Sequence, residues 1–222
     1  MNNGIYASER ADSLFEIGIG KTPPRKEREW FSDKREKNTI WLSIKDMANP
    51  GAYALDSSEY ITVSAVQQKR IRKVPAGSIL LSFKLTVGRV KIAGTDMTTN
   101  EAIACFASSD ARKLAWLYPY LLTFDYSKLG NTSSIATAVN SKTIKEMPIA
   151  MPDEESLDEF QKFTMPLYRL MKSNQTETGR LQQLRDALLP KLMSGEIDVS
   201  KVDLTQLNSH LVVCAECDEN IC

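Results

Sequence analysis

Residues that could carry metal or nucleophilic chemistry are scarce and lie near the C-terminal end. The sequence has one histidine, His210, and four cysteines, three of them within the last nine residues. A Ser-His-Asp triad or a zinc hydrolase site in the main part of the chain has no histidine to use. The tail holds four residues that could ligate Zn²⁺, with a Cys-x-x-Cys spacing: His210, Cys214, Cys217 and Cys222. Because the tail lacks glycine turns and aromatic residues, we favour a tail without metal.

Nucleotide and DNA-modifying chemistry is also poorly encoded. Residues 18–22, Gly-Ile-Gly-Lys-Thr, lack the first glycine of a phosphate-binding loop, and we interpret them as a strand-to-loop exit. The Thr-Pro-Pro-Arg of residues 22–25 has only the prolines of an amino-methyltransferase motif. Pro152-Asp153 is followed by no acidic-x-Lys triplet of a Mg²⁺-dependent nuclease. We therefore expect a protein that is not itself an enzyme and needs no cofactor.

The charge of the chain is balanced overall and uneven along its length. Residues 1–152 carry 21 Lys and Arg against 15 Asp and Glu, whereas residues 153–222 carry 7 against 13. A basic first part suits contact with phosphates. No apolar stretch has the length of a membrane span, and the first ten residues do not resemble a signal peptide. We expect a cytoplasmic protein with reduced cysteines and no membrane contact.

Long basic and short polar side chains recur between the candidate strands of the first part. Lys and Arg can hold phosphates, Arg can pair with guanine, and Asn or Thr can bond to base edges. Acidic residues such as Glu27 and Glu29 lie among the first cations, so a solvated surface is the competing interpretation. The candidate DNA-binding residues are Lys21, Thr22, Arg25, Lys69, Arg70, Lys84, Arg89, Asn100, Asn131, Thr132 and Ser133.

These residues belong to a stretch with short β-rich segments that end at Pro, Gly, Asn or Asp. The pattern predicts strands at residues 40–44, 60–63, 78–83 and 89–93, and another at residues 147–151. Helical spacing of Leu114, Leu117, Tyr118 and Leu121 predicts one helix over residues 111–123. The fold class is α+β, with one β-rich domain over residues 1–152.

A long helix follows the β-rich domain, over residues 153–198. Ser156-Leu157-Asp158-Glu159 fits a capping box at its start, Gly195 fits its end, and Pro166 predicts a kink or break. Apolar residues recur at seven-residue intervals, the pattern of a helix that pairs as a coiled coil. The residues expected to face a partner helix are Phe160, Leu167, Leu170, Asn174, Leu181, Leu184 and Leu188. The acidic tail over residues 199–222 is expected to be disordered.

One segment near the end of the long helix is distinctive: Leu-Gln-Gln-Leu-Arg-Asp-Ala-Leu-Leu-Pro-Lys-Leu-Met-Ser-Gly-Glu-Ile at residues 181–197. It follows an ordered set of shorter motifs, Gly-Ile-Gly-Lys-Thr-Pro at residues 18–23 and the segments at residues 41–46, 74–82, 99–103, 130–132 and 144–149. Taken in this order, over about residues 14–199, the features resemble one half of the specificity subunit of type I restriction-modification systems.

The resemblance implies a target-recognition domain for double-stranded DNA that positions methyltransferase (modification) subunits, with or without a restriction nuclease subunit. It also implies that the long helix spaces two such domains. Since this chain has one domain and one helix, it is a half-subunit that forms a homodimer, one that pairs with a different half, or a fragment; we favour the homodimer. The competing functions are a coiled-coil adaptor with a protein-binding head, and a small DNA methyltransferase or nuclease.

Overall fold

The computed structural model describes residue 6, residues 8–129 and residues 139–198. Of the residues proposed to bind DNA, Asn131, Thr132 and Ser133 lie outside these ranges. The same is true of the four candidate zinc ligands and of the tail expected to be disordered.

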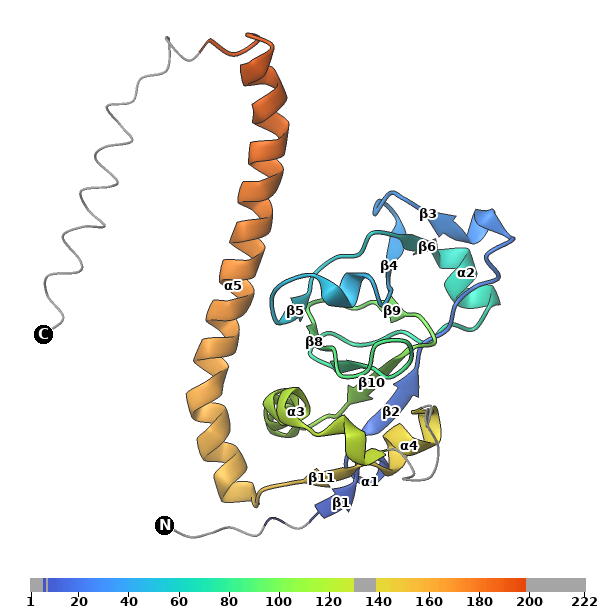
Figure 1. The fold of residues 1–222 in the computed structure, drawn as a ribbon, viewed down its shortest axis with the longest axis vertical. Coiled ribbons are helices and arrows are strands. Elements are labelled where there is room, and N and C mark those ends of the chain that lie inside the picture. Colours follow the sequence, from blue (N-terminus) through green and yellow to red (C-terminus); the bar gives the residue numbers. More distant parts are fainter. Residues whose placement is uncertain (1–5, 7, 130–138, 199–222) are drawn as a thin grey trace, which may run out of the picture. The chain divides into compact units, whose positions relative to one another are not determined.

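A five-stranded sheet forms the centre of the β-rich part (Figure 1). Its neighbours pair antiparallel, apart from β5 and β8, which pair parallel. The strand order is β2 (Glu16–Ile19), β10 (Ile103–Ala107), β7 (Ile79–Ser82), β8 (Val90–Ala93) and β5 (Tyr53–Ala54). The predicted strands over residues 78–83 and 89–93 are thus confirmed, each slightly shorter than expected.

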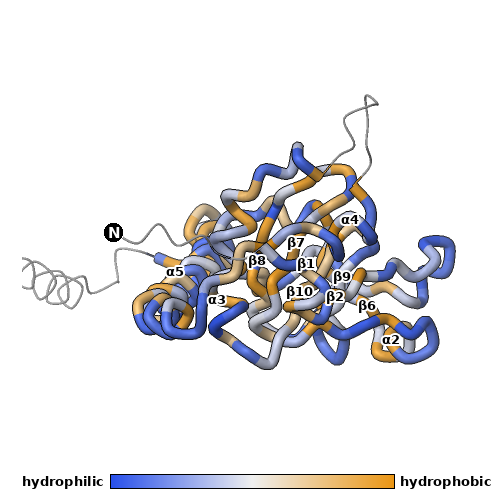
Figure 2. The backbone as a smooth tube through the Cα atoms, turned by 90° about the horizontal axis from the view of Figure 1, so that it is seen from below, coloured by the Kyte–Doolittle hydropathy of each residue, from blue (hydrophilic) through white to orange (hydrophobic). Residues whose placement is uncertain are grey.

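Both faces of the middle strands β7, β8 and β10 are buried, which explains why these strands are mostly apolar. On β7, Ile79 and Leu81 join the core cluster that contains residues of helix α3 (Ala111–Thr123), whereas Leu80 joins a second cluster on the opposite face. Figure 2 shows apolar residues concentrated in the strands, with hydrophilic residues in the peripheral loops. The helix predicted over residues 111–123 has the expected bounds.

A four-stranded sheet covers the face opposite α3 (Figure 1). Its order is β3 (Phe31–Ser32), β6 (Tyr60–Thr62), β4 (Asn38–Leu42) and β9 (Thr98–Thr99). Helix α2 (Val63–Gln68) packs on its outer side. Val63 was predicted in a strand and instead begins α2, because the hydroxyl of Thr62 accepts a hydrogen bond from the amide of Ala65 and caps that helix.

The first and last strands of the β-rich part pair with each other. Strand β1 (Ser8–Arg10) pairs antiparallel with β11 (Pro148–Ala150), which confirms the strand expected near residues 147–151. The short helices α1 (Ala11–Leu14) and α4 (Ser141–Glu146) lie beside this pair and contribute to the same core. The chain then continues into α5.

Helix α5 (Glu154–Met193) differs from the expectation at its start and middle. The carboxylate of Asp153, rather than a Ser156 capping box, accepts the amide hydrogen bond of Ser156 at 2.8 Å. The helix continues without a break through Pro166, although Pro166 has no N–H to donate. Its packing on the sheets compensates, since Leu157 and Thr164 are buried. Gly195 follows the end with φ +75°, as predicted.

Contacts divide the chain into two compact units, Met1–Thr176 and Glu177–Cys222. In the first unit, α5 is attached to strand β5 and to helix α3 by hydrogen bonds. The side-chain amide of Gln175 makes two with the backbone of Tyr53, at 2.7 and 3.0 Å, and the hydroxyl of Tyr168 donates to the carbonyl of Ala115 at 2.8 Å. Among the described residues, no helix is long and apolar enough to span a membrane.

The attachment of α5 predicts a strong dependence of stability on Leu157, whose side chain is 1% exposed. We expect Leu157→Ala to lower the free energy of unfolding by about 2–5 kcal/mol, because it leaves a cavity between the helix and the core. The matched control is Leu122→Ala on the exposed side of α3, with an expected change of less than about 0.5 kcal/mol. Urea unfolding followed by circular dichroism measures both, and equal losses would contradict the attachment.

Candidate nucleic-acid interface

The antiparallel register brings three loops to one edge of the five-stranded sheet. Strand β2 ends, β7 ends and β10 begins at this edge, because Ala104 pairs with Ile19 and Ile103 pairs with Ser82. We call residues 20–22, 84–89 and 100–102 the loop edge. It gathers five of the predicted DNA-binding residues, Lys21, Thr22, Lys84, Arg89 and Asn100.

Close backbone contact holds the first and third loops of the loop edge together. The amide of Lys21 donates to the carbonyl of Thr99 at 2.8 Å, and that of Gly20 to the carbonyl of Ile103 at 3.2 Å. A Cβ atom on Gly20 would overlap with the carbonyl oxygens of Thr99 and Asn100. Glycine is therefore required here because two backbone segments of the chain approach each other closely.

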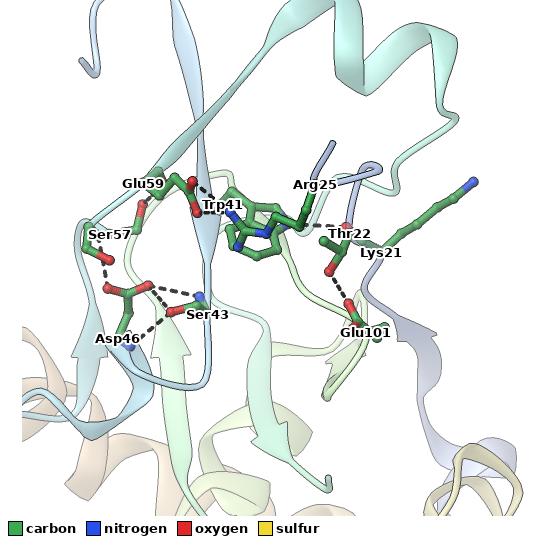
Figure 3. A network of polar contacts seen from close by, with 10 residues as sticks. Lys21, Thr22, Arg25, Trp41, Ser43, Asp46, Ser57, Glu59 and Glu101 are labelled. Carbon is green, nitrogen blue, oxygen red and sulfur yellow. Dashed lines mark hydrogen bonds and ion pairs between the residues drawn. The ribbon is translucent and has the colours of Figure 1, made fainter. Parts of the chain in front are cut away.

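The polar side chains of these two loops are partly engaged with the loops themselves. The hydroxyl of Thr22 donates to the carboxylate of Glu101 (Figure 3). The side-chain oxygen of Asn100 accepts the amide hydrogen bond of Ala102 at 3.1 Å. Asn100 can therefore offer its NH₂ group to a base edge while its oxygen shapes the turn.

The second loop of the loop edge is the β7–β8 hairpin. Arg89 donates from Nη1 to the carbonyl of Ile44 at 2.8 Å, which ties the hairpin to the loop after β4. Lys84 is exposed, with its ammonium nitrogen 5.5 Å from the centre of the Phe83 ring. The hairpin thus contributes two cations, Lys84 just after β7 and Arg89 just before β8.

Arg25 is stacked on aromatic rings, and 53% of its side chain remains exposed. Its guanidinium carbon lies 4.4 Å from the centre of the Phe31 ring and 4.6 Å from that of Trp41. Its Nη1 atom donates to both carboxylate oxygens of Glu59 at 2.7 Å (Figure 3). This arrangement fixes the plane of the guanidinium and leaves its geometry suited to a bidentate contact.

A groove beside Arg25 has a volume of about 720 Å³. Arg25, Arg28 and Lys45 contribute cations to its walls, and Asp33 and Glu59 contribute carboxylates. The acidic residues reduce the positive field of the groove, as the sequence indicated for the first basic clusters. The groove therefore has little excess positive charge, and its Arg25 is held in place by neighbouring side chains.

Lys69 repeats the pattern of Arg25 at the end of α2. Its ammonium nitrogen lies 2.9 Å from a carboxylate oxygen of Glu27 and 4.7 Å from the centre of the Trp30 ring. Hydrogen bonds from Lys69 and Trp30 lower the pKa of Glu27. The ammonium of Lys21 donates to the carbonyl of Lys69 at 2.7 Å, which connects this cluster to the loop edge.

Arg70 follows in the left-handed conformation, with φ +51°, and is exposed. Its amide donates to the carbonyl of Gln67 at 3.2 Å and ends the helix. All eight described candidates thus lie at the loop edge or in the adjoining Arg25 and Lys69 clusters. Sequence reasoning missed their orienting partners Trp41 and Glu59, which are distant in the sequence.

Asp46 holds the loop after β4 in place. Its carboxylate accepts hydrogen bonds from the amide and hydroxyl of Ser43 at 2.9 and 2.6 Å, and from the amide of Ser58 at 2.9 Å. Burial raises the pKa of Asp46, but these hydrogen bonds lower it by more, so it lies below its ordinary value. The residue is 5% exposed and positions the chain segments that carry Ile44 and Glu59.

The residues proposed to face a partner helix behave differently along α5. Phe160 packs edge-on against Trp116, with ring centres 5.0 Å apart, so it already has a contact within the chain. In the first unit, Leu167 and Leu170 are 46% and 57% exposed, and Asn174 lies on the exposed surface. In the second unit, Leu181, Leu184 and Leu188 are 56%, 54% and 37% exposed.

Within the described residues there is no group of three or more His, Cys, Asp or Glu side chains placed to hold a metal. The remaining cysteine, Cys105, is buried in the second core cluster, and burial raises its thiol pKa to about 11. Cys105 therefore acts as a small apolar residue.

Comparison with known proteins gives one consistent family. Residues 7–185 match the model of a family described as the type I restriction modification DNA specificity domain. The specificity subunit of the type I restriction enzyme HindI from Haemophilus influenzae is 30% identical over 188 residues, 83% of this chain and 40% of that protein. The MjaIX specificity subunit from Methanocaldococcus jannaschii is 29% identical over 151 residues, 66% of this chain and 34% of that protein.

A solved structure shares the fold. The S subunit of the type I restriction-modification system from M. genitalium superposes with a TM-score of 0.57 at 14% identity, over 87% of this chain and 47% of that chain. This chain spans well under half the length of the two curated relatives that it matches.

The hydrogen bonds to Asp46 predict a pH-dependent effect of its substitution. Because its pKa is lower in the folded than in the unfolded chain, the carboxylate stabilises the fold above the unfolded value of about 4 and loses this contribution as pH falls through the folded value. We expect Asp46→Asn to lower the free energy of unfolding by about 2 kcal/mol at pH 7, with the deficit shrinking below about pH 4.

Urea unfolding of both proteins at a series of pH values measures this deficit. Asp33→Asn, at an exposed position, is the control and should change stability little at any pH. A deficit for Asp46→Asn that is the same at pH 3 and pH 7 would contradict the role of the ionised carboxylate.

Proposed function

We propose that this chain, which belongs to the family of type I restriction-modification DNA specificity domains, recognises one part of a double-stranded DNA target and is not itself catalytic. The observation that carries the proposal is the loop edge, where Lys21, Lys84 and Arg89 lie together with Thr22 and Asn100. This combination suits DNA, because cations hold phosphates and fix the register while short polar groups and Arg read base edges.

The orientation of the cations favours sequence recognition over general attraction to DNA. A zero net charge gives little non-specific affinity, and Glu27 and Glu59 further weaken the local field. What these carboxylates supply is a fixed geometry for Lys69 and Arg25. A pre-oriented guanidinium loses less entropy when it forms a bidentate contact with guanine.

Catalysis belongs to partner subunits in this proposal. The chain positions a methyltransferase that carries the methyl donor, and a restriction nuclease subunit joins the same complex where one is present. We assign the cytoplasm as its location, because the DNA target lies there. A coiled-coil adaptor with a protein-binding head is the main competing function, and it lacks the salt dependence that phosphate contacts produce.

The exposed apolar side chains of α5 support a second part of the proposal, in which two copies of the chain pair through this helix. Leu167 and Leu170 in the first unit and Leu181, Leu184 and Leu188 in the second recur at heptad spacing. A soluble protein gains free energy by burying such a row against a second helix. A homodimer then reads a target whose two parts are related by two-fold symmetry.

Phosphate contact by the hairpin predicts a change in the salt dependence of DNA binding. We expect Lys84→Ala to reduce the slope of log affinity against log salt by about 1, because one fewer counterion is released. Lys145→Ala is the control, since Lys145 is exposed on α4, beside the start of β2 at the opposite edge of the sheet.

Fluorescence anisotropy at several salt concentrations measures the slopes. The duplex carries the sequence that the chain causes to be methylated when it is produced with its methyltransferase, identified by sequencing of modified adenines. An unchanged slope for Lys84→Ala, or an equal change for Lys145→Ala, would exclude this phosphate contact. If DNA binding by the unsubstituted chain did not depend on salt concentration, the adaptor function would be favoured.

Pairing through α5 predicts that the mass of the chain in solution depends on the apolar row. We expect the chain to be a dimer by light scattering and the double variant Leu184→Glu with Leu188→Glu to be a monomer, because two buried glutamates in the seam repel their counterparts. Leu122→Glu on α3 is the control and should remain a dimer. A monomeric unsubstituted chain would rule out the homodimer and favour a different partner half or a longer parent protein.

A further inference from the structure

The most exposed apolar side chain of the loop edge is that of Leu85, and Val87 in the same hairpin is 39% exposed. Leu85, in the β7–β8 hairpin, is 94% exposed and has φ +63°. The left-handed conformation is unfavourable for the backbone of a branched apolar residue. The exposed side chain contributes no free energy of burial to offset this cost. An observed conformation of this kind is a reason to look for a binding role, because strained residues cluster at sites that contact ligands.

The hairpin holds Leu85 in this position. The hydroxyl of Ser82 donates to the carbonyl of Thr86 at 2.6 Å and accepts from the amide of Arg89 at 3.0 Å. The amide of Gly88 donates to the carbonyl of Ser82 at 3.0 Å. These bonds close the loop on the end of β7, so the residue at the tip is presented by a fixed frame rather than by a flexible segment.

The side of the hairpin is also supported. Gly88 has φ +93°, and a Cβ there would press on the ring of Tyr126 at 3.1 Å. The hydroxyl of Tyr126 donates to the carbonyl of Leu121 on α3 at 2.7 Å. The hairpin loop therefore packs against the Tyr126 ring, which is hydrogen-bonded to α3. Leu85 is the most exposed apolar residue of this loop.

The charges around Leu85 indicate the chemistry of its partner. Lys84 precedes it, Arg89 lies at the base of the same hairpin, and Lys21 lies in the neighbouring loop of the edge. The carboxylate of Glu101 is engaged by Thr22. An exposed apolar tip with Lys84 next to it, and with Val87 39% exposed in the same hairpin, fits the surface of a duplex, where phosphates flank the stacked bases, better than it fits an apolar protein groove.

From this geometry we propose that Leu85 is a wedge that inserts at a base step of the target duplex, while Lys84 and Arg89 hold phosphates beside that step. The inference rests on the proposed function and adds to it a site of DNA deformation. Inserted apolar side chains partly unstack a step and bend the duplex, and flexible pyrimidine–purine steps are the easiest to open. The chain then favours certain steps at positions where it makes no base-specific hydrogen bond.

The test uses the full chain in complex with its methyltransferase subunits and without a methyl donor. The probe is a set of duplexes of the methylated sequence, each with 2-aminopurine at a different position, whose fluorescence rises when the base loses its stacking. We expect a rise at one step distinct from the adenine that is methylated. Leu85→Ala should abolish that rise and weaken binding roughly tenfold, the factor that corresponds to about 1.4 kcal/mol.

Two further variants keep the result interpretable. Leu85→Met retains a long apolar side chain and should retain the fluorescence rise, and Leu122→Ala, which removes a leucine that is 52% exposed on α3, should change nothing. An equal rise in Leu85→Ala and in the unsubstituted complex would overturn the wedge while leaving DNA recognition intact. Failure of the unsubstituted complex to bind the duplex at all would instead refute both the proposed function and the wedge.

Photocrosslinking identifies the partner of Leu85 directly. A p-benzoylphenylalanine residue in place of Leu85 should crosslink to the duplex, and the same residue in place of Leu122 should not. Crosslinking of position 85 to a methyltransferase subunit would overturn the proposal and identify the hairpin as a protein-docking element.

Discussion

The antiparallel pairing of β10 with both β2 and β7 is the constraint on which the candidate interface depends. This register places the end of β2, the β7–β8 hairpin and the turn before β10 at one edge of the sheet. It is enforced by burial, because the sheet has a core cluster on each face and a one-residue slip would turn every side chain to the wrong face. The positions of the three loops of the candidate interface are thus fixed by the packing of the sheet beneath them.

Carboxylates then determine how the cations in the adjoining Arg25 and Lys69 clusters can act. Glu59 and Glu27 pair with Arg25 and Lys69, and exposed pairs of this kind add little to stability. Their effect is geometric, since each holds a cation against an aromatic ring. Asp46 fixes the geometry of the backbone in a similar way. Its hydrogen bonds connect the segment around Ile44, whose carbonyl accepts a hydrogen bond from Arg89, to the segment that carries Glu59.

Local patterns were sufficient to predict much of the fold. Helical spacing gave α3 its correct bounds, because the residues that fix it are neighbours in the sequence. The same reasoning predicted a kink or break at Pro166, and the structure has no break there, because the burial of Leu157 in the core offsets the local cost of proline. The pairing of Arg25 with Glu59 could not be read from the sequence, because the β3–β6–β4 arrangement that joins them is a long-range contact.

A single loop edge sets a limit on how much sequence one chain can specify. Each base pair read contributes about 1–3 kcal/mol of discrimination, and phosphate contacts contribute affinity without any. Under the proposed function, the fixed geometry of the side chains offsets the small number of DNA contacts, and this gain ends once each side chain is oriented. A further gain in specificity requires either deformation of the duplex or a second reading surface. Under the proposed function, the exposed Leu85 supplies the first of these routes and the apolar row of α5 supplies the second.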